Sequence, residues 1–118
     1  MRFSIFQDSA LGGRASNQDR MGYCFTRESL LMVVADGMGG HLRGEVAAQI
    51  TMQTAGAVFQ QMAKPVLGDP IGFLDHALRQ AHREILRYQS LHGMPESPRT
   101  TVVACVVQGG KAWWAHAG

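Results

Sequence analysis

The chain has 118 residues, 46% of them hydrophobic and 17% charged, and its formal net charge at pH 7 is +2. The length predicts one domain, and the apolar fraction is sufficient for a packed core. Charges of both signs are scattered without a basic stripe, so we expect no nucleic-acid partner and no attraction to a membrane surface.

The first predicted elements are a strand and a polar loop. Residues 2–7 alternate apolar and polar side chains, which is typical of a half-buried strand, and residues 8–18 contain glycine breakers. The start of the chain lacks the long apolar segment of an export signal, and no apolar run is long enough to cross a bilayer. Cys24 and Cys105 are isolated within apolar segments, so we interpret them as reduced packing residues of a cytoplasmic protein.

Two strands follow, over residues 21–26 and 30–35. The second has no polar residue, which is typical of a strand buried on both faces. The polar link over 27–29 is so short that we expect an antiparallel hairpin, with the start of one strand beside the end of the other. Because Asp19 and Asp36 are equally distant from this link, their Cα atoms should lie about 5 Å apart.

Two carboxylates this close repel each other, and a hard divalent cation with oxygen ligands would relieve the repulsion. The alternative is a solvated strand end whose acids point apart. Asp36 is followed by a glycine-rich turn over 37–40, where backbone can approach a bound group closely. The simpler interpretation of this turn is a strand, a tight turn and a helix start, since short glycine motifs often match by chance.

Two helices are predicted next. The first runs from the glycine turn to about residue 63, with one apolar face formed by Val46, Ile50, Ala57, Val58 and Met62. The second begins at Asp69-Pro70, an N-cap acid followed by proline at the first helical position, and ends at Gly93. Its apolar stripe consists of Ile71, Leu74, Leu78, Ala81, Ile85 and Tyr88.

The last elements are two strands, over residues 101–107 and 112–116, joined by a turn at Gly109-Gly110. This turn should place Gly118 beside Thr101. The whole order predicts an α+β fold in which antiparallel strand pairs flank two helices that cover a sheet face.

Several motifs, in order along the chain, resemble the bacterial branch of the PP2C-type (PPM) metal-dependent protein serine/threonine phosphatases. The two most specific are Arg14-x-x-Asn17-Gln18-Asp19 and Val34-Ala35-Asp36-Gly37-Met38-Gly39-Gly40-His41. The likeness continues in Glu45-Val46-Ala47-Ala48, Arg99-Thr100-Thr101-Val102 and Ala115-His116-Ala117-Gly118.

The resemblance implies an αββα four-layer sandwich of the PP2C type. Residues 1–118 would be the N-terminal portion of this single domain, with antiparallel strands and two helices, and a further metal-binding aspartate would follow Gly118. The implied activity is hydrolysis of phosphoserine and phosphothreonine in proteins by a metal-activated water, opposing a serine/threonine kinase. The complete domain would hold two Mn²⁺ or Mg²⁺ ions, so we expect the isolated chain to be inactive or nearly so.

The resemblance also implies roles for individual residues. Asp36 would be the ligand that bridges the two metal ions, and Gly37 would offer its backbone carbonyl. Asp19 would bind the second ion directly or through a water. Arg14 would hold the phosphate with its planar guanidinium, although a surface loop charge is the alternative. Gln18 stands where the family often has glutamate, and its neutral amide is a weaker ligand for a hard cation.

We assign no catalytic role to the histidines. His41 could reach a substrate, but a solvent-facing residue at a helix start is an equal alternative. We expect surface positions for His76, His82 and His92 and a packed position for His116. Thr100 and Thr101 could support the site through hydroxyl hydrogen bonds, or could simply begin a strand.

Two other functions remain open. One is a non-catalytic pseudophosphatase or interaction module that keeps the fold. The other is an unrelated phosphate binder using the glycine-rich turn, which is weaker because no lysine or Ser/Thr follows the glycines as in a P-loop.

Overall fold

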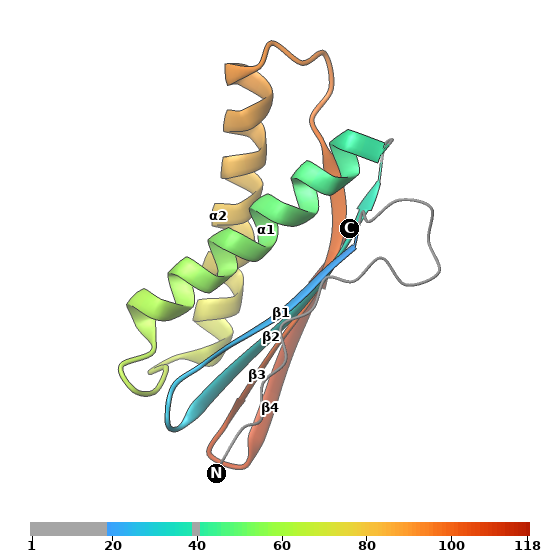
Figure 1. The fold of residues 1–118 in the computed structure, drawn as a ribbon. Coiled ribbons are helices and arrows are strands. Elements are labelled where there is room, and N and C mark those ends of the chain that lie inside the picture. The colour runs from blue at the N-terminus through green and yellow to red at the C-terminus, as the bar shows by residue number, and fades with distance from the viewer. Residues whose placement is uncertain (1–18, 39–40) are drawn as a thin grey trace.

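The computed structural model describes residues 19–38 and 41–118 and shows two long helices on one face of an antiparallel sheet (Figure 1). The sheet order equals the chain order: β1 (Asp19–Phe25), β2 (Ser29–Met38), β3 (Arg99–Gln108) and β4 (Lys111–Ala117). The helices between β2 and β3 are α1 (His41–Met62) and α2 (Pro70–Leu91). The predicted α+β order is therefore confirmed for the described residues, whereas the predicted strand over 2–7 and loop over 8–18 lie outside them.

The register of the sheet brings the two acids together. Asp19 and Asp36 are Cα partners in the β1–β2 ladder, as the hairpin predicted. On its other side Asp36 is the partner of Thr101 in β3. Since Val102 pairs with Ala117, Gly118 follows beside Thr101, and a Cβ at Gly118 would lie 2.8 Å from Cγ2 of Thr101. One row across the sheet thus runs from Asp19 to Gly118.

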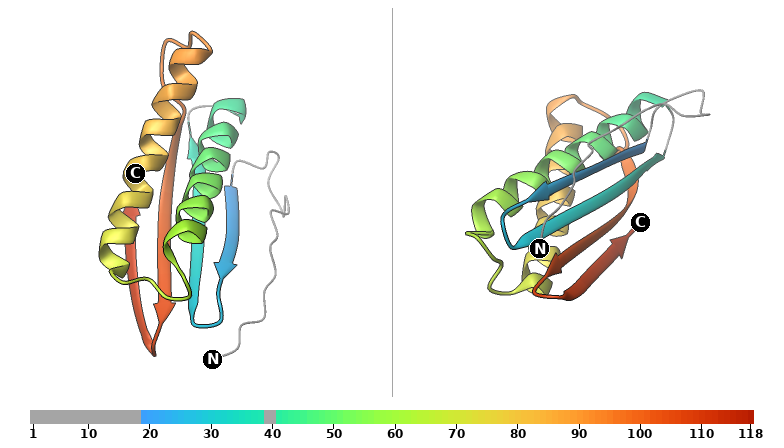
Figure 2. Two further views of the ribbon diagram at one scale, coloured as in Figure 1. Left: turned by 90° about the vertical axis from the view of Figure 1, so that its left-hand side faces the viewer. Right: turned by 60° about the horizontal axis from the view of Figure 1, so that its bottom comes forward.

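The helices cover only one face of the sheet (Figure 2). Along β2 the side chains alternate, and the buried positions are Ser29, Leu31, Val33, Ala35 and Gly37. On the opposite face Val34 is 46% exposed and its β3 partner Val103 is 50% exposed. The expectation that residues 30–35 are buried on both faces is therefore wrong for this chain, because nothing in the described chain covers the second face.

Helix α1 packs on the sheet through mostly small side chains. Its buried residues are Gly44, Ala47, Ala48, Thr51, Ala55, Val58 and Phe59. Of the face predicted for this helix only Val58 is buried, while Ala57 and Met62 are exposed. Apolar residues occur all round α1, so periodicity alone does not select the face that contacts the sheet.

Helix α2 begins as predicted, with Oδ1 of Asp69 accepting a hydrogen bond of 3.0 Å from the Gly72 N–H and with Pro70 in the first turn. Its buried residues are Phe73, Leu74, Ala77, Ala81 and Ile85. Phe73 meets Phe59 of α1 edge to face, with ring centroids 5.8 Å apart. Ile71, which the predicted stripe included, is exposed because the stripe instead passes through Phe73.

The connector between the helices is tied to the hairpin ends of the sheet. The Gln108 side chain accepts a hydrogen bond from the Leu67 N–H and donates one to the Leu67 carbonyl, at 2.8 and 2.9 Å. The Thr26 hydroxyl donates to the Pro65 carbonyl. These bonds fix the end of the sheet that lies opposite Asp36.

Candidate functional site

Asp36 lies near the end of β2, on the sheet face opposite the helices. Its neighbours Ala35 and Gly37 are buried under the helices, and successive side chains of a strand point to opposite faces, so Asp36 belongs to the other face. Its side chain is half-buried there. An acid at a sheet end can therefore meet a ligand from the open side.

The backbone places the other predicted ligand directly beside it. Asp19 is the first residue of β1 and the Cα partner of Asp36. The side chain of Asp19 and the residues Arg14 and Gln18 lie outside what the structure describes. The structure thus brings two of the predicted site positions together and leaves the phosphate-binding role of Arg14 a prediction.

Gly37 is required by packing. A Cβ at this position would lie 2.1 Å from the carbonyl oxygen of Gly44, in the first turn of α1, and 2.3 Å from its carbonyl carbon. No real Cβ tolerates such distances, and the obstacle is backbone, which cannot rotate away. The sequence predicts a carbonyl ligand at Gly37 but does not single out Gly44, whose available signal is an isolated glycine in a predicted helix.

Two threonines of β3 lie next to this strand end. The hydroxyl of Thr101 donates to the backbone carbonyl of Asp36 over 3.4 Å, which is a long hydrogen bond. The hydroxyl of Thr100 donates to the Thr101 carbonyl over 2.8 Å. Both threonines pair with the strand end, and the Thr101 hydroxyl is the one that bonds to a site residue.

The donor atoms here suit a hard divalent cation. The carboxylate of Asp36, an aspartate at the paired position 19 and the backbone carbonyl of Gly37 are oxygen donors of the kind that Mg²⁺ and Mn²⁺ prefer. Among the described side chains no group of three or more His, Cys, Asp and Glu could hold an ion. The residues fit a metal as a partial ligand set.

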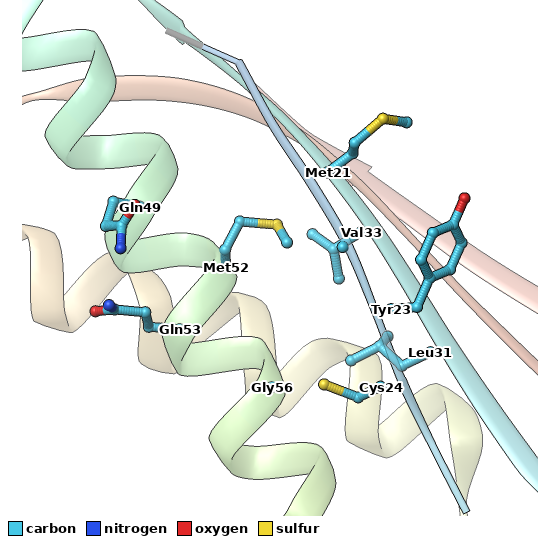
Figure 3. A pocket seen from close by; sticks show the side chains of 10 residues that line it. Met21, Tyr23, Cys24, Leu31, Val33, Gln49, Met52, Gln53 and Gly56 are labelled. Atoms are coloured by element: carbon cyan, nitrogen blue, oxygen red, sulfur yellow. The ribbon is translucent and has the colours of Figure 1, made fainter. Parts of the chain in front are cut away.

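A cavity of about 370 Å³ lies elsewhere, between β1 and α1 (Figure 3). Met52 of α1 and Val33 of β2 point toward each other across it, and Cys24 and Gly56 line its far end. None of the predicted site residues lines this cavity. It therefore has no part in the site at Asp36.

A second cavity, of about 420 Å³, reaches the same end of the sheet as Asp36, on the side of the helices. Met38, Thr100 and Gly118 line it, together with His82 of α2. The space behind the strand ends is thus not filled by the described residues.

The histidines and cysteines behave as surface and packing groups. His76, His82 and His92 are exposed, as expected. His116 is also exposed, so its expected packing is wrong, because β4 is an edge strand whose outer face is uncovered. The side chain of His41 lies outside the description.

Both cysteines are free and half-buried. Burial raises the pKa of the Cys24 and Cys105 thiols above the ordinary value, which disfavours the thiolate. They are therefore poor nucleophiles at neutral pH, in agreement with a packing role. Within residues 19–38 and 41–118, neither helix combines the length and the apolar character needed to cross a bilayer.

Comparison with known proteins gives a consistent family match. The family model described as protein phosphatase 2C matches residues 7–118. Serine/threonine protein phosphatase PstP of Mycobacterium tuberculosis is 32% identical over 118 residues, which cover 100% of this chain and 21% of PstP. Serine/threonine phosphatase stp of Listeria monocytogenes is 24% identical over 107 residues, which cover 89% of this chain and 42% of stp. The chain thus spans less than half of either relative.

Solved structures share the fold. The serine/threonine phosphatase of S. agalactiae superposes with a TM-score of 0.76 at 24% identity, over 98% of this chain and 47% of that chain. The M. tuberculosis phosphatase PstP/Ppp superposes with a TM-score of 0.72 at 29% identity, over 99% of this chain and 46% of that chain. The four strands and two helices therefore correspond to about half of these structures.

Proposed function

The chain belongs to the protein phosphatase 2C family, and on this premise we propose that the protein hydrolyses phosphoserine and phosphothreonine in other proteins. The observation that carries the proposal is the pairing of Asp19 with Asp36 at the end of a strand that continues into Gly37. This pairing places oxygen donors side by side at the motif that the family resemblance assigns to metal binding. Fold likeness alone would leave the chemistry open.

The metal would be Mn²⁺ or Mg²⁺, with two ions in the complete domain. Asp36 would hold both ions, Asp19 one of them, and Gly37 would contribute its backbone carbonyl. Such ions, when bound, lower the pKa of a coordinated water and offset the charge of a phosphate. The first effect provides a nucleophile for phosphoester hydrolysis, and the second stabilises the negative charge of the reacting phosphate.

The chain's own residues would orient the substrate and hold the strand end. Arg14, in the loop before β1, would bind two phosphate oxygens through its planar guanidinium. Thr101 would help to fix the Asp36 peptide through its hydroxyl. The open sheet face would be covered by a second sheet, which makes residues 1–118 the N-terminal portion of an αββα domain.

The substrate would be a phosphorylated protein in the cytoplasm, so that the enzyme opposes a serine/threonine kinase. We expect neither a nucleic-acid nor a membrane partner, since the chain has a net charge of only +2.

The test is a metal-dependence assay on the full-length protein. We expect release of phosphate from a phosphothreonine peptide, loss of release with EDTA and recovery with Mn²⁺ in excess. The matched phosphotyrosine peptide is the control. Phosphatase activity that survives EDTA would refute the metal role, and Mn²⁺ binding without turnover would favour a non-catalytic module of the same fold.

A further inference from the structure

We propose that Gly44 is a positioning residue, which sets the place of the Asp36–Gly37 peptide through direct backbone contact between α1 and the end of β2. The proposal rests on the proposed metal site, and it concerns this chain's own support for that site. Gly44 itself would touch neither metal nor substrate.

The first support is steric. A Cβ built on Gly37 would lie 2.1 Å from the Gly44 oxygen and 2.7 Å from the Gly44 Cα. Ordinary contacts of a Cβ begin near 3.4 Å, so a methyl there would force the two backbones apart by roughly 1 Å. A glycine inside a strand often marks such a close approach of another backbone.

The second support is the helix side of the contact. Glycine is less favourable than alanine in a helix, by about 1 kcal/mol in the interior, so a buried glycine in the first turn points to a packing reason. Gly44 is buried, and it starts the small stripe that Ala47, Ala48 and Thr51 continue along the sheet. The stripe lets α1 approach the sheet, and Gly44 is the member of the stripe whose backbone contacts Gly37.

The third support comes from what holds each partner. The end of β2 is paired with β3, since Asp36 pairs with Thr101 and Gly37 with Thr100. The first turn of α1 has an ion pair between Arg43 and Glu96 at 3.7 Å, but the Glu96 side chain is 72% exposed and such surface pairs contribute little. This ion pair joins the turn to the segment before β3, whereas the steric contact with Gly37 joins the turn to the site.

The consequence is geometric. Metal ligands must be held within about 0.5 Å of their binding positions, so a displacement of roughly 1 Å at Gly37 would weaken metal binding. A methyl at Gly37 should therefore lower metal affinity before it unfolds the protein, and a methyl at the buried Gly44 would have to be accommodated in the same packed interface.

The experiment uses the full-length protein with Mn²⁺ alone as the probe. Its variants are Gly37→Ala, Gly44→Ala and the matched control Gly56→Ala, which adds a methyl to the same helix. A Cβ at Gly56 would meet only the Cys24 sulfur, at 3.3 Å. Calorimetry would give the Mn²⁺ dissociation constant, and circular dichroism would report whether each variant is folded.

We expect Gly37→Ala and Gly44→Ala to weaken Mn²⁺ binding at least about tenfold in folded protein. A loss of this size is typical when a residue that supports a metal ligand is changed. Gly56→Ala should bind like the parent. Parent affinity in a folded Gly37→Ala or Gly44→Ala variant would overturn the proposal. So would failure of both variants to fold, because the contact would then support the whole fold. If the parent itself bound no Mn²⁺, the proposed metal site would fail first.

Discussion

Asp36 and Asp19 are direct partners in the β1–β2 ladder. Two aspartates at directly paired positions are unfavourable without a cation, because like charges on opposed strands repel. The pairing therefore argues for a bound cation more strongly than either acid does alone.

The first prediction concerns the carboxylate of Asp36. In the full-length protein, Asp36→Asn removes one charged oxygen ligand while it keeps the size of the side chain. We expect Mn²⁺ affinity to fall more than about a hundredfold, which exceeds the loss typical of residues that only support a metal ligand. Phosphatase activity should fall with it. Calorimetry and phosphopeptide hydrolysis measure the two effects.

The matched control for this change is Asp69→Asn. It makes the same chemical replacement at the start of α2, where asparagine caps a helix as well as aspartate does. Metal affinity and activity should stay at the parent values. Equal effects of the two substitutions, or none at Asp36, would remove Asp36 from the metal site.

The hairpin and its register could be predicted because the evidence was local. A polar link at 27–29 between two apolar strands leaves few possible pairings, and each places Asp19 near Asp36. The cap at Asp69 and the turn at Gly109-Gly110 were equally local signals, and both lie where the sequence placed them. Short-range chemistry determined these elements.

The helix faces and the contact at Gly37 depend on packing between elements distant in sequence. Helix α1 is apolar all round, so only its docking on β2 selects the buried side, and four of its five predicted face residues are not buried. The Gly37–Gly44 contact follows from the distance between a strand and a helix. The local sequence of neither segment determines that distance.

The second prediction concerns the contact between the helices. Phe73 has no exposed surface and meets Phe59 edge to face. Phe73→Ala should lower the free energy of unfolding by about 3–5 kcal/mol, as large-to-small changes in a core do. Leu91→Ala in the same helix, where Leu91 is 71% exposed, should change it by less than about 0.5 kcal/mol. Urea unfolding of the full-length protein compares them, and similar losses would contradict the core at Phe73.

The third prediction concerns the amide of Gln108, which makes two hydrogen bonds to the Leu67 backbone. Gln108→Ala should destabilise the protein by about 1–2 kcal/mol, since each bond contributes about 1 kcal/mol net. Gln108→Glu keeps an acceptor for the Leu67 N–H but removes the donor to the Leu67 carbonyl. It should therefore lower the free energy of unfolding by at least the contribution of one hydrogen bond, about 1 kcal/mol. Gln60→Ala, at an exposed position of α1, is the control. Thermal unfolding that does not distinguish Gln108→Ala from Gln60→Ala would show that this connector is held by other contacts.

The fourth prediction concerns the open sheet face in the isolated 118-residue chain. Val34 and Val103 are directly paired at its centre, and both are about half exposed. Uncovered apolar sheet surface promotes association, so we expect this chain to form oligomers and to bind a hydrophobic dye. The double substitution Val34→Thr and Val103→Thr keeps β-branched side chains and should shift the chain toward monomer in light scattering. Leu86→Gln, on the exposed side of α2, should leave the oligomers unchanged. A parent chain that is monomeric and binds no dye would contradict the expectation that this face must be covered.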